Sequence, residues 1–395
     1  MVHLATKLPS FPSAQESIEQ TLEITLTSKR VERLTERIGQ ERVTQREEEI
    51  DEWEQLPAGE KSGVPAGVSA PEVVSVSCDG GRLQRCDLPE DAKSHWCESK
   101  VGILLELEPR LHNTDPRPQV PERFLDLGRV DKLAGEIKGG APKGRQFQRF
   151  SDKVPRSRAA SAKRRNPVSR APVVISREVV ASLADSTTFG KQLAARAWLR
   201  GFAVALRKGF VADGQSSNWG IWERHFKDLG FVPIVDFIHA LTYVYAAAMA
   251  GRPTAQGWPT YVRWITWVWE GQVKRAIKEL AVRKAELGPS SAAASETDPR
   301  RIVADALTYL RNQQSRMNYP EYRRLGLPIV SSHVESAVKQ VSQRVKGSEK
   351  FWSRRGGEAL LQLRADQLSD SRPLDRFWRE RPSEATGTRY YRMAA

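Results

Sequence analysis

The stretch from Leu327 to Gly347 reads LPIVSSHVESAVKQVSQRVKG, and it predicts an amphipathic helix that begins after a serine pair. Serine is a favoured N-cap residue, and apolar residues then recur at helical spacing along one face: Val334, Val338, Val341 and Val345. Glu335 falls in the first turn, where the helix dipole favours a carboxylate. The opposite face carries cations: Lys339, Arg344 and Lys346. A surface helix is the plainer interpretation of this stretch taken alone.

Two aspartates earlier in the chain follow apolar runs that predict β-strands. Asp79 comes at the end of EVVSVSC, and Asp213 at the end of GFVA. A second β-rich run, SHWCESKVGILLELEP, follows Asp79. An Asp-Gly pair by itself is more typical of a hairpin turn, so neither aspartate indicates a site without the other acidic residues.

Two strand-end aspartates followed by a helix-borne glutamate form the acidic triad of the RNase H-like nucleotidyl transferases. The chain resembles the DDE transposases of bacterial insertion sequences, in the ISKra-type group related to Mutator-like elements. The segments that carry the resemblance are DGGRLQ with ESKVG after it, VADG with VDFIHALTYVYAAAMAGR, and HVESAVKQVSQRVKGSEKFW. The resemblance implies an α/β fold with an RNase H-like catalytic core, a helical insertion and an N-terminal helical region.

The resemblance also implies that Asp79, Asp213 and Glu335 are the catalytic residues. Three carboxylates brought together repel one another unless a cation compensates. Oxygen ligands with a phosphate substrate indicate Mg²⁺, with Mn²⁺ as a substitute, and two ions about 4 Å apart would activate the attacking oxygen and stabilise the leaving oxygen. The three residues are therefore expected to be metal ligands. Asp236 and His239 match the Asp-x-x-His pair of Mutator-like relatives and are expected to be auxiliary residues.

The implied reaction is hydrolytic cleavage at insertion-sequence ends, followed by attack of the freed 3′-hydroxyl on target DNA. The expected partners are double-stranded DNA, as terminal repeats and target, and further copies of the chain on that DNA. Composition agrees with a polyanionic partner, because 62 Lys and Arg against 48 Asp and Glu give a net charge of +14. Basic ribosomal or membrane-surface proteins share this property.

The resemblance implies a bacterial, nucleoid-associated protein, and the sequence predicts a cytoplasmic protein that does not bind a membrane. An odd count of cysteines, 3 in all, is typical of a reducing compartment, and their spacing does not suit a zinc site. The first residues lack the pattern of a signal peptide. The apolar run 231–250 contains Asp236 and His239, so a buried helix is a better interpretation than a membrane span.

Composition and periodicity, read with what the resemblance implies about a core and its helical insertion, divide the chain into five regions. We expect an N-terminal helical region and linker at 1–70, for which DNA-end binding is one open role. The first part of the core is expected at 71–250. A helical insertion at 251–319, the rest of the core at 320–378 and a basic tail at 379–395 complete the chain. Within the core, 176–207 predicts a pair of helices. In the insertion, a group of tryptophans is more typical of helical core than of a base-stacking surface: Trp258, Trp264, Trp267 and Trp269.

The segment 138–171 is strongly basic and poor in large aliphatic residues, so it predicts a loop or arm. Contact with DNA phosphates and a solvated loop without a partner are both open for such a segment. The expected DNA-binding residues combine this arm with the helix described first: Lys163, Arg164, Arg165, Lys339, Arg344 and Lys346.

Two other functions fit the same sequence features. A transposase-derived DNA-binding protein would keep the charge and fold without catalysis. An RNase H-like nuclease or resolvase would keep the triad without specificity for terminal repeats. Cleavage assays on end-bearing and end-lacking duplexes separate these alternatives.

Overall fold

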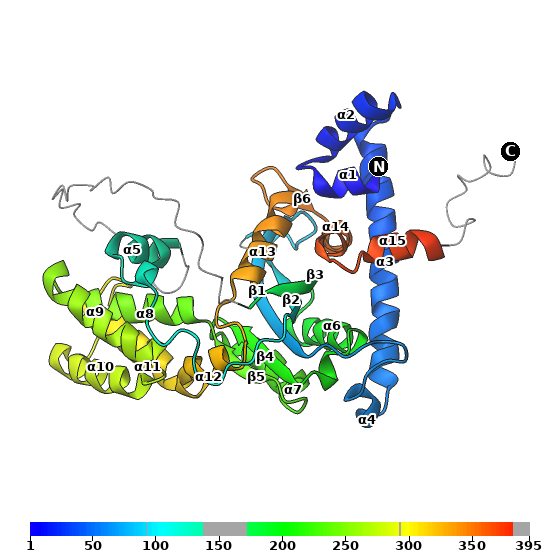
Figure 1. The fold of residues 1–395 in the computed structure, drawn as a ribbon. Helices are drawn as coiled ribbons and strands as arrows, with labels where there is room; N and C mark the ends of the chain where they lie inside the picture. Colours follow the sequence, from blue (N-terminus) through cyan, green and yellow to red (C-terminus); the bar gives the residue numbers. More distant parts are fainter. Residues whose placement is uncertain (93, 137–171, 292–293, 382–395) are drawn as a thin grey trace, which may run out of the picture. The chain divides into compact units, whose positions relative to one another are not determined.

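The computed structural model describes residues 1–92, 94–136, 172–291 and 294–381. The chain divides into two compact units (Figure 1). The first comprises Met1–Glu108, Val173–Pro233 and Ser331–Ala395, and the second comprises Pro109–Pro172 and Ile234–Val330. The predicted division differs, because residues 1–70 belong to the same unit as the strands that follow them.

The first unit is built on a mixed six-stranded sheet in the order β3-β2-β1-β4-β5, with β6 paired to β1. The strands are β1 (Val73–Arg85), β2 (Trp96–Leu107), β3 (Val174–Ser182), β4 (Arg207–Ala212), β5 (Val232–Val235) and β6 (Phe351–Trp352). β2 is antiparallel to both β1 and β3, whereas β4 and β6 run parallel to β1. The α/β class predicted from the sequence is confirmed.

Helices cover both faces of this sheet, which explains why β1 begins as a nearly continuous apolar run. On one face, α6 (Ser186–Leu199) lies so close to Gly102 that a Cβ there would clash with the Leu193 side chain. α7 (Ser216–His225) follows β4 and contacts the same face through Asn218. On the other face, α13 (Ser332–Val345) and α14 (Arg354–Leu368) lie against β1.

The N-terminal helices pack on this core as part of the same unit. They are α1 (Val2–Lys7), α2 (Phe11–Leu22), α3 (Ser28–Gln55) and α4 (Ala58–Lys61). Val2 and Ile38 join Leu363 of α14 and Phe377 of α15 (Pro373–Glu380) in one buried apolar cluster.

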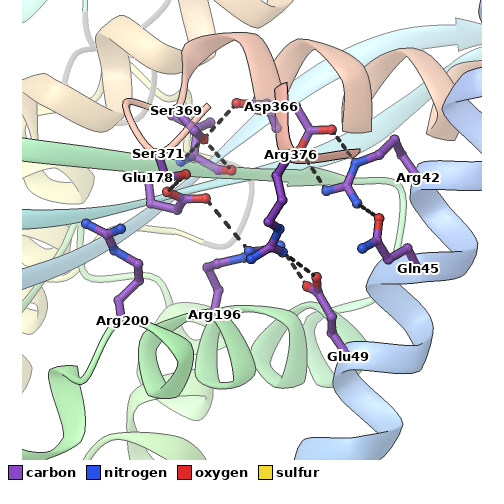
Figure 2. Close-up of polar contacts among 12 residues, drawn as sticks. Arg42, Gln45, Glu49, Glu178, Arg196, Arg200, Asp366, Ser369, Ser371 and Arg376 are labelled. Atoms are coloured by element: carbon purple, nitrogen blue, oxygen red, sulfur yellow. Dashed lines mark hydrogen bonds and ion pairs between the residues drawn. The ribbon is translucent and has the colours of Figure 1, made fainter. Parts of the chain in front are cut away.

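A buried polar network also ties α3 to the core (Figure 2). Arg196 of α6 lies between Glu49 of α3, at 3.0 Å, and Glu178 of β3, at 3.9 Å. Arg42 of α3 donates to Asp366 of α14 at 2.9 Å. Buried charges are stable only when paired, so these contacts fix where α3 lies against the sheet.

The second unit is helical in the part that the structure describes. Its helices are η1 (Glu122–Phe124), α5 (Leu127–Glu136), α8 (Phe237–Met249), α9 (Thr254–Trp269), α10 (Val273–Leu287), α11 (Pro299–Gln313), η3 (Gln314–Arg316) and α12 (Tyr319–Arg324). Trp264 and Trp269 are buried in this unit, as the core interpretation of the tryptophan group predicts, and Trp258 and Trp267 are partly buried.

Two local predictions are wrong. The segment 176–207 does not form a helix pair, because its first part is strand β3 and α6 follows, with the short turn η2 (Phe202–Val204) before β4. The run REVVAS is rich in β-branched residues that fit a strand. Asp79 does not end a strand either, because β1 continues to Arg85 and pairs with β2 along that length.

No helix in the described ranges combines the length and apolar character that a bilayer crossing requires. The apolar run 231–250 forms β5 and α8, and α8 buries most of its residues.

Candidate metal centre

The parallel pairing of β1 and β4 brings Asp79 and Asp213 to the same level of the sheet. The register matches Val73 with Arg207 and ends by matching Ser77 with Val211. Each aspartate comes two residues after the last matched pair, and residues two apart on a strand point to the same face. β4 ends at Ala212, so Asp213 is the first residue after it, and continuing the register brings its backbone level with Asp79 on the neighbouring strand.

The same face of β1 lies beneath α13, which carries Glu335. Gly81 shares a face with Asp79, and a Cβ added at Gly81 would meet Val338 at 3.7 Å and Ser342 at 3.8 Å. Glu335 precedes Val338 by three residues, so it lies on the same helix face, one turn toward the N-terminus. The absence of a side chain at Gly81 thus allows the helix with Glu335 to approach the strand with Asp79.

Hydrogen bonds hold both aspartate carboxylates in place. Oδ1 of Asp79 accepts from the Gly80 N–H at 2.7 Å. Oδ1 of Asp213 accepts from the Gln215 N–H at 3.0 Å and from the Asn218 amide at 2.9 Å. The Asn218 carbonyl in turn accepts from the Cys78 thiol at 3.3 Å. The sequence analysis missed this contact of Asn218 with Asp213, since nothing in its local pattern separates Asn218 from an ordinary helix residue.

The Cys78 thiol lies close enough to Asp79 and to Asp213 for each of their charges to affect it. Burial raises the pKa of Cys78 well above its usual range, and the negative charges of Asp213 and Asp79 raise it further. The thiol is therefore neutral, and Cys78 acts as a hydrogen-bond donor behind Asn218. The expectation of reduced thiols agrees with the structure, in which Cys78, Cys86 and Cys97 form no disulfide.

Glu335 lies in the first turn of α13 and is partly buried. Its Oε1 accepts from the Ser331 hydroxyl at 3.4 Å. Among the residues that the structure describes, the ligand oxygens of Asp79, Asp213 and Glu335 do not all come within 4.8 Å of one another. In the described residues these three carboxylates therefore do not form a tight single-ion cage.

The cations of α13 have two different environments. Lys339 and Lys346 are exposed, as predicted. Arg344 is only 2 % exposed, so its assignment to the solvent-facing side of the helix, and to DNA contact, is wrong. Its guanidinium lies 4.4 Å from the centre of the Phe11 ring and 5.2 Å from that of Trp352, and its Nε donates to the Ala5 carbonyl at 2.8 Å.

The auxiliary pair belongs to the second unit. Asp236 is fully buried and forms the N-cap of α8, because its Oδ1 accepts from the N–H groups of Ile238 and His239. His239 Nδ1 lies 3.7 Å from the same oxygen. This arrangement gives Asp236 a structural role as a helix cap.

Lys163, Arg164 and Arg165 fall outside the described residues, as do the rest of the arm at 138–171 and the end of the tail from residue 382 onward. The arm prediction stays a prediction.

The chain was compared with known proteins, and neither a family model nor a curated protein matches it.

Proposed function

We propose that this protein is a metal-dependent DDE transposase with an RNase H-like core, which cleaves DNA at insertion-sequence ends and joins the freed 3′-hydroxyl to target DNA. The sheet order β3-β2-β1-β4-β5 supports this core, with three antiparallel strands followed by β4, which is parallel to β1. The position of α13 on one sheet face, with α6 and α7 on the other, supports it as well.

One observation carries the proposal. The register of β1 with β4 sets Asp79 level with Asp213, and Gly81 admits α13 with Glu335 over that same face. We infer that three residues far apart in the sequence contribute their carboxylates to one site. Surface carboxylates that serve only solubility are not expected to lie level on neighbouring strands, next to a glycine that allows a helix to approach.

The residues present fit divalent magnesium or manganese. Mg²⁺ binds carboxylate oxygens at about 2.0–2.1 Å and keeps several waters, so oxygens that bind one ion lie within about 4 Å of one another. A pair of ions about 4 Å apart is held by carboxylates spread more widely than that. Asp79, Asp213 and Glu335 do not all lie within 4.8 Å of one another, and in the proposal they would hold two such ions, whose charge would activate the attacking oxygen and stabilise the leaving oxygen.

The chain's own residues then have separate roles. Asp79, Asp213 and Glu335 would hold the metal ions, and Asn218 orients the Asp213 carboxylate through its amide. The exposed Lys339 lies on α13 one turn beyond Glu335, where it would contact a DNA phosphate. The second unit and the basic arm would add further DNA contacts and pairing of copies on two ends.

The proposal is tested with purified protein on duplexes that carry, or lack, the terminal sequences flanking its own coding region. We expect Mg²⁺-dependent nicking at the ends and loss of at least about 100-fold in rate for Asp79→Asn, Asp213→Asn and Glu335→Gln, because each removes a ligand on which the reaction depends. DNA binding should be retained. The matched control is Glu98→Gln, an exposed carboxylate on β2 whose partner is Lys100 at 2.7 Å.

Other outcomes would contradict the proposal in distinguishable ways. Equal nicking of end-bearing and end-lacking duplexes would identify a nuclease or resolvase. Tight binding to DNA without cleavage in Mg²⁺ or Mn²⁺ would identify a non-catalytic DNA-binding protein. Normal cleavage by one triad variant would remove that residue from the metal site.

A further inference from the structure

The exposed face of α3 carries opposite charges in its two halves. The other face of this helix packs on α14 and α6 of the same unit (Figure 1). Three arginines lie in the half toward the N-terminus and three carboxylates in the half toward the C-terminus: Arg30, Arg33, Arg37, Glu47, Glu48 and Asp51. α3 has 28 residues and is therefore about 42 Å long, so the two charges occupy separate regions of one surface.

This order of charges destabilises α3 as an isolated helix. The helix dipole favours acidic residues in the first turn and basic residues in the last turn, and α3 has neither. Like charges four residues apart on a helix repel each other, and this spacing separates Arg33 from Arg37 and Glu47 from Asp51. Surface charges that serve solubility are interspersed. Charges that oppose the stability of their own helix indicate a partner that compensates them.

The ion pairs between α3 and other elements of the first unit use other residues of the helix. They are formed by Glu41, Arg42, Arg46, Glu49 and Glu54. Among the six charged residues of the exposed face, and within the described part of the chain, only Glu47 lies within 4.0 Å of an opposite charge. It is 4.0 Å from Arg46 and 63 % exposed, and Arg46 is itself held by Glu358 at 2.9 Å. The charges of this face are thus available to a second molecule.

The residues along the middle of this face recur at steps of four and three, as they do where two helices coil around each other. They are Arg33, Arg37, Gln40, Thr44, Glu47 and Asp51. The charges are symmetric about position 42, because Arg37 and Glu47 lie 5 residues on either side of it (42 − 37 and 47 − 42). Arg33 and Asp51 lie 9 residues on either side (42 − 33 and 51 − 42). The same helix turned end for end about this point presents a carboxylate opposite each arginine.

The charge pattern distinguishes between two occupants of this face. A nucleic acid would attract the three arginines, but the carboxylates on the same face would repel it. The α3 helix of a second copy, lying antiparallel, would meet each half with the opposite charge. A two-fold axis forms each ion pair twice, and opposite potentials across an interface fix how the two molecules are aligned. The second copy is therefore the occupant that both halves of the face favour.

We propose that two copies of this protein pair through α3, with the two helices antiparallel about a two-fold axis between Gln40 and Thr44. Arg37 of each copy pairs with Glu47 of the other copy, and Arg33 pairs with Asp51 in the same way. Exposed ion pairs are individually weak and are screened by salt, so this dimer is weak and dissociates as the ionic strength rises. The pairing needs neither metal nor DNA, so the inference goes beyond the proposed function and does not rest on it.

The test measures self-association of the full chain by sedimentation equilibrium, without DNA, at about 0.1 M and about 1 M salt. Arg33→Glu/Arg37→Glu makes the face predominantly acidic, and Glu47→Arg/Asp51→Arg makes it predominantly basic. Each double variant should self-associate at least about 10-fold more weakly than wild type at the lower salt, because like charges then face each other. An equimolar mixture of the two should associate at least as tightly as wild type, and the higher salt should weaken both associations.

The quadruple variant Arg33→Glu/Arg37→Glu/Glu47→Arg/Asp51→Arg is the matched control. It contains both sets of substitutions but restores complementarity with the charge order reversed, so it should self-associate as wild type does. Neither double variant should melt at a lower temperature than wild type, because each moves α3 toward the charge order that the helix dipole favours. Thermal melting of all three variants checks that their association is compared between folded proteins.

Three results would overturn the inference. Wild type and the mixture could both remain monomeric at the lower salt, which would exclude pairing through this face. Both double variants could associate as wild type does, which would place the contact elsewhere. Loss in the double variants without recovery in the mixture or the quadruple variant would show that the face binds something other than its own copy. Duplex binding that weakens in Arg33→Glu/Arg37→Glu and tightens in Glu47→Arg/Asp51→Arg would then identify nucleic acid as the occupant.

Failure of the proposed function gives a different result, because the association is measured without metal or DNA. A wild-type protein that pairs as expected and cleaves no DNA would contradict the proposed function alone.

Discussion

The register of β1 with β4 sets Asp79 and Asp213 at the same level of the sheet, because their separation in the sequence matches that of the paired residues. They are 134 positions apart (213 − 79), and the β1–β4 register pairs residues at the same interval, as in Val73 with Arg207. The aspartates could be selected from the sequence because each follows an apolar run. Their alignment could not, because register depends on how β2, β3 and α6 fold between the two strands.

The hydrogen-bonding residues around the site were less predictable than the carboxylates. Asn218 depends on the turn between β4 and α7 to reach Asp213. The prediction for Arg344 was wrong. Helical periodicity placed it among exposed cations, whereas α1 and α2 cover it. Periodicity identifies the faces of a helix and cannot show which distant segment packs on each face.

His225 makes stability depend on pH. Its Nε2 is buried with no hydrogen-bond partner among the described residues, and burial lowers its pKa to about 4, with Arg224 and Lys191 adding to the shift and Glu54 opposing it. The ordinary pKa is 6.5, so the unfolded chain binds more protons between these values and stability falls as the pH drops through this interval.

Thermal unfolding at pH 7 and pH 5 tests this expectation. The melting temperature of His225→Phe should fall less between pH 7 and pH 5 than that of wild type. Phenylalanine keeps a ring against Trp53 and removes the titrating group. His95→Phe, at an exposed histidine, should keep the wild-type difference. Equal pH differences in wild type and His225→Phe would contradict the assignment.

At the scale of elements, α13 is held at both ends. Its first half lies over β1 through Val338 and Gly81, and its second half is joined to α1 and α2 through Arg344. The Nη2 of Arg344 is buried with no hydrogen-bond partner among the described residues, and burial lowers the pKa of Arg344 to about 10. Phe11 and Trp352 stabilise the charge through their ring faces. The N-terminal helices therefore help to set where Glu335 lies.

Arg344→Ala should destabilise the protein by about 2–4 kcal/mol, since it empties the space between two rings and removes the donor to Ala5. Arg344→Met should cost less, because it fills the space without a buried charge. Urea unfolding measures both changes. Lys339→Ala, at an exposed position of the same helix, is the control, and a loss for Arg344→Ala no larger than this control would contradict the role of Arg344.

The strands and helices themselves were predictable to different degrees. β1 and β2 were found from their apolar runs, and α13 from its valine spacing. β3 was mistaken for a helix, because REVVAS joins directly to the helical run of α6 and no glycine or proline separates them. The β-branched residues in β3 were the available signal.

At the scale of the whole molecule, the N-terminal helices could not be placed from the sequence. A charge-rich segment such as α3 is typical of a solvated arm, yet Arg42 and Arg46 are buried. Their partners come from α14, more than 300 residues later in the chain. Ion pairs between segments this distant leave no local pattern. The acidic triad of the proposal was selected through the resemblance, because the order Asp, Asp, Glu of that motif is kept across long insertions.

The central claim is that Asp79, Asp213 and Glu335 together bind divalent metal ions. The most direct measurement is Mn²⁺ binding, followed by electron paramagnetic resonance in the presence of a short DNA duplex, for wild type, the three triad variants and the Glu98→Gln control. Loss of a ligand should weaken Mn²⁺ affinity by at least about 10-fold, so we expect Asp79→Asn, Asp213→Asn and Glu335→Gln each to show this loss while Glu98→Gln binds as wild type does. Wild-type Mn²⁺ affinity in all three triad variants would contradict the claim.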